Sequence, residues 1–317
     1  MHNIKTLHLK GDNILLNYPE KSSILQKLEL LNVYGTLTFE QSLMYERLKR
    51  GFNGEKQLAS RLNSSLLDNY TAIYDLRLKV NESEIQVDCL LLIGQKIFLF
   101  EVKNYRGNYL FKNNQWFLAS SGKEIKNPLH QVQRSELLLQ EFFSEHHLSH
   151  PFSSKLIFIH PEFHLYQAPM HTSIIFPAQM EQFIQSLHLE SAKPIEESFY
   201  TIADTLRKHH QTTSLYEQIP DISFSQLKKG IFCKQCKSVM APFTHKTFVC
   251  RICKQKESKE KAVLRTIYNY QILFPDERIT PERIFIWIGK TVSKRTIQRI
   301  LIKHFSIHKN GPETFYQ

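Results

Sequence analysis

The stretch IQVDCLLLIGQKIFLFEVKN, residues 85–104, predicts two buried β-strands joined by a turn at Gly94-Gln95. Asp88 interrupts the apolar run of the first strand, and Glu101 and Lys103 end the second. Side chains two apart on a strand project from the same face, so Glu101 and Lys103 lie together, and the hairpin brings Asp88 near them. An isolated ionised carboxylate in a buried strand is unstable, so these residues are expected to be paired or to bind a metal.

Two convergent carboxylates beside a lysine predict chemistry on a phosphate. Carboxylate oxygens suit a hard divalent cation such as Mg²⁺ or Mn²⁺. Beside such an ion, Lys103 can position an attacking water or stabilise the charge that grows on a phosphoryl oxygen during in-line displacement. The alternative is that Glu101 and Lys103 form a surface ion pair without function. The apolar neighbours of Asp88 argue against a solvated face at that position.

Patterns on either side of this hairpin predict a mixed α/β domain. Its further strands are expected at 70–80, 155–160 and 173–176, with a hairpin over 108–118 and helices over 39–67, 127–145, 178–188 and 196–210. Asn127 followed by Pro128 marks the start of one helix. The fold class predicted is a central sheet flanked by helices.

Residues along this domain resemble a known family. They are Gly54-Glu55, Asp88, the run Glu101-Val102-Lys103-Asn104 with Gly107, Asn127-Pro128 and Gln131. Together they resemble the nuclease-related domain called NERD, of the PD-(D/E)XK restriction-endonuclease-like group, over residues 40–160. Val87 stands where the family pattern has a proline before the aspartate.

The resemblance implies a restriction-endonuclease-like sheet in which Asp88 and Glu101 bind Mg²⁺ or Mn²⁺ and Lys103 is catalytic. It also implies that Glu55 adds a carboxylate to the metal site from the first helix, and that Gln131 joins the site from the helix after the core strands. Taken singly, Glu55 fits better a solvated helix carboxylate, and Gln131 fits an ordinary polar residue of an amphipathic helix.

Four of the five cysteines form two Cys-x2-Cys pairs, Cys233 with Cys236 and Cys250 with Cys253. Two such turns predict a closed tetrahedral Zn²⁺ site, a zinc ribbon, whose ion supplies folding free energy to a segment too small for its own core. A pair of disulfides is the alternative. It is disfavoured because the sequence has no secretory pattern and no apolar run of about 18 residues, which together predict a cytoplasmic, reducing location.

The basic excess of the chain is confined to its C-terminal part. The whole chain has 41 Lys+Arg, 30 Asp+Glu and a formal net charge of +11, whereas residues 228–317 alone carry +13. A basic segment joined to a near-neutral body predicts a module that binds nucleic acid. Membrane-surface attachment is the less favoured alternative, since no apolar face is expected beside the charge.

Two helices near the C-terminus have helix-turn-helix spacing. Thr280 with Pro281, and then Ser293, mark their starts. A third helix over 259–273 completes the unit. The face of the last helix that suits phosphates and base edges carries Lys294, Arg295, Gln298, Arg299 and Lys303. The alternative is an amphipathic helix with a solvated basic side.

These predictions divide the chain into an N-terminal segment (1–38), a nuclease-like domain (39–210), a linker (211–230), a zinc ribbon (231–257) and a helix-turn-helix-like domain (258–317). The predicted function is hydrolysis of DNA phosphodiester bonds by a metal-dependent nuclease that the C-terminal modules deliver to DNA. The alternative is a catalytically silent NERD platform that acts as a DNA-binding or regulatory protein. The presence of Asp88, Glu101 and Lys103 favours the nuclease.

Overall fold

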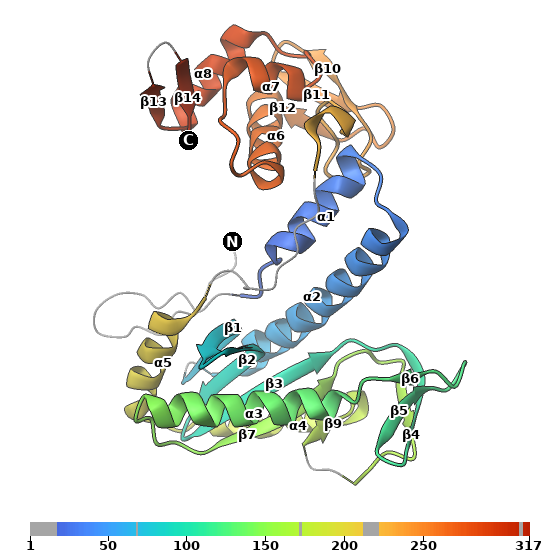
Figure 1. The fold of residues 1–317 in the computed structure, drawn as a ribbon, viewed down its shortest axis with the longest axis vertical. Coiled ribbons are helices and arrows are strands. Elements are labelled where there is room, and N and C mark those ends of the chain that lie inside the picture. The colour runs from blue at the N-terminus through green and yellow to red at the C-terminus, as the bar shows by residue number, and fades with distance from the viewer. Residues whose placement is uncertain (1–17, 68, 171–172, 212–221, 311–312) are drawn as a thin grey trace. The chain divides into compact units, whose positions relative to one another are not determined.

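The computed structural model describes residues 18–67, 69–170, 173–211, 222–310 and 313–317. The chain divides into two compact units, whose elements Figure 1 labels. The sheet unit takes the described residues of Met1–Lys21 and Arg47–Glu217, and the ribbon unit those of Ser22–Glu46 and Gln218–Gln317. The sequence-based division differs from these units, because it sets 1–38 apart and places 39–46 with the sheet.

The core of the sheet unit is a five-stranded mixed sheet, so the predicted fold class is confirmed. Its order is β1-β2-β3-β7-β9, in which β1, β2 and β3 are antiparallel neighbours and β7 and β9 run parallel to β3. The strands are β1 (Tyr70–Val80), β2 (Ser83–Ile93), β3 (Lys96–Lys103), β7 (Phe152–Phe158) and β9 (Ile174–Ile175).

A second, smaller sheet of the same unit has the order β6-β5-β4-β8. It consists of β4 (Gly107–Lys112), β5 (Gln115–Leu118), β6 (Glu124–Ile125) and β8 (Phe163–Tyr166). Asn113 and Asn114 have positive φ angles of 53° and 61°, which a tight two-residue turn between twisted strands requires. The hairpin expected over 108–118 therefore forms.

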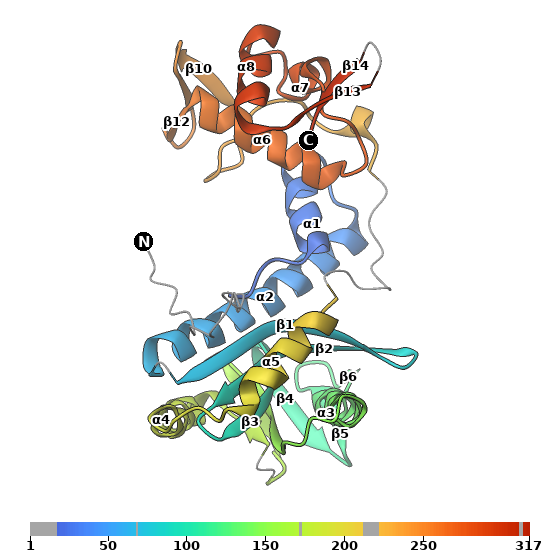
Figure 2. The same ribbon diagram turned by 90° about the vertical axis from the view of Figure 1, so that its left-hand side faces the viewer.

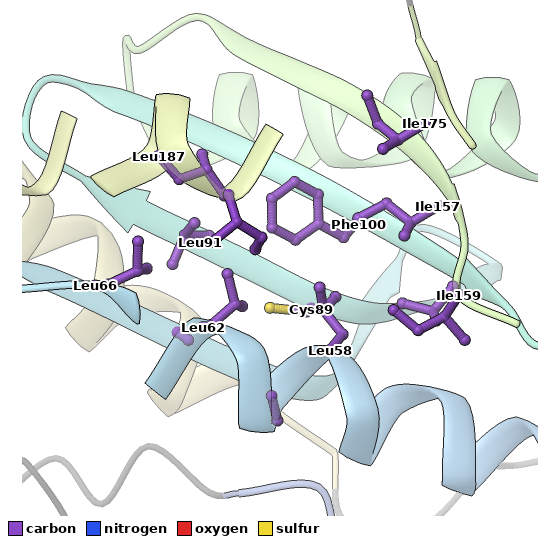
Figure 3. Close-up of a cluster of buried hydrophobic side chains, with 14 of the residues drawn as sticks. Leu58, Leu62, Leu66, Cys89, Leu91, Phe100, Ile157, Ile159, Ile175 and Leu187 are labelled. Atoms are coloured by element: carbon purple, nitrogen blue, oxygen red, sulfur yellow. The ribbon is translucent and has the colours of Figure 1, made fainter. Parts of the chain in front are cut away.

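Helices cover both faces of the five-stranded sheet (Figures 1 and 2). On one face pack α2 (Phe39–Ser65) and α4 (Met180–Ser191), which follows the short 3-10 helix η1 (Pro177–Gln179). On the other pack α3 (Pro128–Glu145) and α5 (Ser198–His209). Figure 3 shows Leu58 and Leu62 of α2 against Cys89 and Phe100 of the sheet. Cys89 is a buried core residue, as expected for a lone cysteine in an apolar strand.

The ribbon unit joins an early helix to the C-terminal part of the chain. The aromatic ring of Tyr34, at the end of α1 (Ser23–Tyr34), stacks on that of Trp287 with centroids 4.4 Å apart. Its hydroxyl accepts a hydrogen bond from Asn269 Nδ2 (3.0 Å). No helix is expected here from the sequence, because its buried face depends on residues far along the chain.

The remaining elements of the ribbon unit follow in chain order. They are η2 (Phe224–Gln226), β10 (Met240–Thr244), β11 (Thr247–Cys250), β12 (Lys256–Ser258), α6 (Lys259–Leu273), α7 (Pro281–Trp287), α8 (Lys294–His304), β13 (Ile307–Asn310) and β14 (Glu313–Tyr316). Thr280 Oγ1 and Ser293 Oγ cap α7 and α8 by accepting hydrogen bonds from the backbone N–H groups of Arg283 and Thr296, as predicted. Among the described helices, none is long and apolar enough to span a bilayer.

Candidate functional site

Asp88 lies in β2 at the point where the regular alternation of side chains between the two faces of the sheet is interrupted. Cys89 packs in the core under α2 and α4, whereas Val87, two residues away, packs under α3 and α5. Residues two apart on a regular strand share a face, so the strand departs from regular alternation here. Asp75, opposite Asp88 on β1, has a left-handed φ of 49° at the same point. The irregularity gives Asp88 a position that differs from those of its apolar neighbours.

The Asp88 carboxylate is fixed by a backbone hydrogen bond. The pairing of β2 with β3 ends at Cys89 and Phe100. Just beyond this pair, Asp88 Oδ2 accepts a hydrogen bond from the N–H of Val102 (2.7 Å). The side chain thus replaces a strand partner, and it is anchored at the end of β3 that carries Glu101 and Lys103.

Lys103 is held between β3 and α3. Its Nζ donates to Glu101 Oε1 (2.6 Å) and to Gln131 Oε1 (2.8 Å). The exposed fraction is 2% for the Glu101 side chain and 17% for that of Lys103, so the pair is not a surface ion pair. The structure therefore brings together Glu101, Lys103 and Gln131 from two elements, and Gln131 is the exposed member of the three.

Glu55 lies on α2 next to Gly54, where this helix approaches the end of β3 closely. A Cβ on Gly54 would lie 2.9 Å from Cβ of Asn104, the residue after β3. Asn104 Nδ2 also donates to the carbonyl oxygen of Arg50 in α2 (3.0 Å). Burial raises the pKa of Glu55 to about 8, together with the negative charges of Asp88, Asp75 and Glu101. Glu55 is half-buried, so it is not the fully solvated helix carboxylate that its local sequence favours.

The carboxylates of the group outnumber the cations. Burial, followed by the charge of Asp88, raises the pKa of Glu101 to about 8, and burial likewise raises the pKa of Asp88. Burial lowers the pKa of Lys103, but the carboxylates of Glu101 and Asp88 outweigh this effect and keep the lysine protonated. If all three carboxyl groups ionised beside the one ammonium group, the group would carry a charge of −2, which one divalent cation would balance.

Asp75 is a fourth acidic residue of this region that the sequence reasoning missed. Its carboxylate accepts hydrogen bonds from Arg77 Nε and Nη2 (both 3.3 Å) and from Gln86 Nε2 (2.7 Å). Arg77 pairs with Asp75, but the negative charge of Asp75 still contributes to the raised pKa of Glu55 and of Asp88. Asp75 could have been found from the sequence in the same way as Asp88, because each is an acidic residue inside an apolar strand.

The donor set of the carboxylate group fits Mg²⁺ in chemistry. Mg²⁺ in proteins binds one or two carboxylates and keeps several waters, so Asp88 and Glu101 are sufficient protein ligands. The carboxylate oxygens of Glu55, Asp88 and Glu101 do not all lie within 4.8 Å of one another. Among the described residues, only the four cysteines bring three or more ligand atoms that close together. Gln131 also lines a polar cleft of about 390 Å³, whose lining residues include Arg134 but none of the three carboxylates.

The four cysteines of the ribbon converge on one point. Their sulfur atoms all lie within 4.8 Å of one another, with Cys233 and Cys253 at 3.5 Å and Cys236 and Cys250 at 3.3 Å. A tetrahedral zinc site with bonds of about 2.3 Å places its sulfurs about 3.8 Å apart, so the cluster fits Zn²⁺ with no open position.

The two cysteine turns have the same backbone geometry. In the first, the N–H of Lys237 donates to the carbonyl oxygen of Cys233 (3.1 Å); in the second, the N–H of Lys254 donates to that of Cys250 (2.9 Å). Both lysines have left-handed φ angles, 63° and 60°. Two equivalent turns that present paired thiols to a common centre are typical of a zinc ribbon.

The basic residues predicted on α8 fall into two groups. Ile297, Ile300 and Leu301 are buried, so the opposite side of the helix is exposed. Lys294 pairs with Glu282, and Lys303 pairs with Glu260 (2.6 Å). The exposed residues without an ion pair to the described part of the chain are Arg295 and Arg299, with Gln298 beside them.

The comparison with known families identifies the segment that holds the carboxylate group. No curated protein and no solved structure matches the chain significantly. The family model described as the nuclease-related domain, NERD, matches residues 50–160. Glu55, Asp88, Glu101, Lys103 and Gln131 all lie within this segment, which is therefore similar to the nuclease-related domain family.

Proposed function

We propose that this protein is a divalent-metal-dependent nuclease that hydrolyses phosphodiester bonds of DNA. The observation that carries the proposal is the half-buried Lys103, held by Glu101 and Gln131 in a region that also contains Asp88 and Glu55, within a segment similar to the nuclease-related domain. A surplus of buried negative charge is unfavourable without a cation, and such surpluses mark functional sites more often than structural ones.

In this proposal, Asp88 and Glu101 hold Mg²⁺ or Mn²⁺, with Glu55 as a further carboxylate. When bound, the ion supplies Lewis-acid polarisation of a phosphoryl oxygen and a more acidic water. Lys103 donates to a phosphate oxygen and stabilises the negative charge that grows there in the transition state. Gln131 accepts from the same ammonium group and orients it, and the Val102 N–H holds Asp88 in place.

The test is cleavage of labelled duplex DNA, single-stranded DNA and RNA with Mg²⁺ or Mn²⁺ added. We expect Asp88→Ala, Glu101→Ala and Lys103→Ala each to lose several kcal/mol of transition-state stabilisation, on the order of 100-fold or more in rate. Asp204→Asn is the matched control, since this carboxylate forms exposed ion pairs on α5. Undiminished cleavage by Asp88→Ala would refute the proposed site.

We further propose that the ribbon unit delivers the nuclease to DNA. Helices α6, α7 and α8 are followed by the β13–β14 hairpin, and Tyr316 of this hairpin pairs with Ile279, between α6 and α7. This order of elements is that of a winged helix-turn-helix, in which the last helix enters the major groove. The exposed Arg295 and Arg299 on α8 and the net charge of +13 over residues 228–317 support the assignment.

A catalytically silent platform that binds or regulates DNA is the second candidate. The observation that favours it is that Lys103 pairs with Glu101, while the carboxylate oxygens of Glu55, Asp88 and Glu101 do not all lie within 4.8 Å of one another. DNA binding by the full chain, without cleavage of any substrate in either metal, would support this candidate.

A further inference from the structure

We propose that the three-stranded sheet of the zinc ribbon binds single-stranded DNA, with one base stacked on Phe243 and the adjacent phosphates on the lysines of the neighbouring cleft. The inference deepens the proposed function and rests on it for the choice of DNA. It concerns binding alone, so it does not depend on whether the carboxylate group cuts.

Phe243 is presented to solvent by an irregularity in β10. The pairing of β10 with β11 shifts between Pro242 and Thr244, the residues on either side of Phe243. A β-bulge of this kind re-aims the side chain that it contains. The ring of Phe243 is 57% exposed, although burying a phenylalanine side chain is favourable by about 1.5–3 kcal/mol. An exposed aromatic ring at a bulge is therefore available to a ligand.

A lysine lies over this ring. Lys256 Nζ, on β12, is 4.6 Å from the centroid of Phe243. The ammonium group and the ring face thus occupy one patch of the sheet. Proteins that bind single strands use this combination, because a base stacks on an aromatic face while a cation neutralises the phosphate next to it.

A basic cleft continues from Lys256. It has a volume of about 570 Å³, and Lys234, Lys256 and Lys261 are among its lining residues. Its acidic residue, Glu257, is already balanced, since it pairs with Arg265 Nη2 (2.7 Å) and with Lys234 (3.2 Å). The cleft therefore keeps a positive charge that a phosphate backbone would neutralise.

The surface around Phe243 combines apolar and basic side chains. Val239 (56%) and Ile252 (72%) are also exposed on the same ribbon. Residues 231–258 carry six Lys+Arg against one Glu. Bases in a duplex are stacked on one another and cannot offer a face to Phe243, whereas unpaired bases can. In this proposal, the aromatic ring favours single strands over duplexes, and the lysines increase the affinity for the phosphate backbone.

The test compares fluorescent single-stranded DNA with the duplex of the same sequence, bound by the full chain without added divalent cation. We expect Phe243→Ala to weaken single-strand binding about tenfold or more and duplex binding less than about twofold. Phe243→Tyr keeps the stacking face and should retain the affinity. Ile252→Ala, an exposed apolar residue that does not line the cleft, is the matched control. Lys256→Ala should reduce the salt dependence of single-strand binding by about 0.7 in the log–log slope.

Three results would overturn this inference. One is an equal loss of duplex and single-strand affinity in Phe243→Ala, and another is no loss of either. The third is competition by poly-glutamate or by anionic lipid vesicles as effective as that by unlabelled single-stranded DNA. Zinc content measured on each variant checks that the ribbon is intact. Since no cleavage is measured, failure of the nuclease proposal would leave this result unaffected.

Discussion

At the scale of single residues, the burial of the acidic side chains around Lys103 makes stability depend on pH. The pKa of both Glu55 and Glu101 is raised to about 8, above the value of about 4.3 for an unfolded chain. Between these values the unfolded chain releases protons that the folded chain retains, so the folded state loses stability as the pH rises. A bound divalent cation removes the penalty by favouring the ionised carboxylates.

We therefore expect the melting temperature of protein without added divalent cation to fall between pH 5 and pH 8 and to recover on addition of Mg²⁺, most strongly at the upper end. Thermal unfolding at three pH values, with and without Mg²⁺, measures both effects. Glu101→Gln should flatten the pH dependence, because it removes one of the two titrating carboxyl groups. A wild-type melting temperature that rises across this window, or that ignores Mg²⁺ at pH 8, would contradict the assignment.

At the scale of the elements, the approach of α2 to the end of β3 decides where Glu55 lies. Gly54 permits it, since a Cβ there would meet Cβ of Asn104 at 2.9 Å. Gly51, one turn earlier, has only an ordinary contact at 3.9 Å, with a flexible carboxylate. We expect Gly54→Ala to destabilise the fold by about 1–3 kcal/mol through overpacking, and Gly51→Ala to stabilise it by about 0.5–1 kcal/mol through helix propensity. Denaturant unfolding compares the pair, and effects of the same sign would refute the close approach.

The zinc ribbon is the second element whose formation can be tested directly. Protein purified without chelators should contain about one zinc per chain, because four thiolates bind this ion far more tightly than carboxylates bind Mg²⁺. Cys233→Ser should lose the zinc and unfold the ribbon, since the ion supplies its folding free energy. Elemental analysis and amide spectra of the variant measure these outcomes. A wild-type chain without zinc would refute the ribbon, whereas the sheet unit should remain folded in the variant.

At the scale of the whole molecule, the basic excess lies in the ribbon unit and the proposed nuclease site lies in the sheet unit. Arg295 and Arg299 have no ion pair with the described residues, whereas Lys294 and Lys303 pair with Glu282 and Glu260. Replacing both arginines by alanine should weaken duplex binding and reduce the salt slope by about 1.8, because each phosphate contact contributes about 0.9. The matched variant, with both lysines replaced, should change the slope less. Fluorescence anisotropy titrations at two salt concentrations measure the two slopes. Equal effects of the arginine and lysine variants would reject α8 as the recognition helix.

Deletion is a poorer test of this separation than substitution. The ribbon unit includes α1 as well as the C-terminal residues, and Tyr34 of α1 stacks on Trp287. Removing residues 228–317 would expose to solvent the apolar face of α1 that packs on these residues. The full chain with point substitutions avoids this exposure, so DNA affinity and cleavage are best compared in such variants.

Many local features of this fold are set by interactions between residues close in the chain. The turn at Asn113-Asn114, the caps Asn127, Thr280 and Ser293, and the strands around Asp88 form where local patterns predict them, because turns and caps depend on a few neighbouring backbone groups. The spacing of the cysteines likewise predicted a cluster that the fold brings together. The roles of the carboxylates and of α8 stay predictions.

Only the tertiary structure decided the rest, and each case depends on residues far apart in the sequence. Tyr34 of α1 stacks on Trp287, a residue more than 250 positions away. Gly54 lets α2, which carries Glu55, approach Asn104 at the end of β3, and Phe243 lies at a bulge of its strand. The sequence by itself determined local features, namely the turns, the helix caps, most helices and strands of the sheet unit and the spacing of the cysteines. Packing over long distances decided which side chains meet, because burial and charge depend on every neighbour in space.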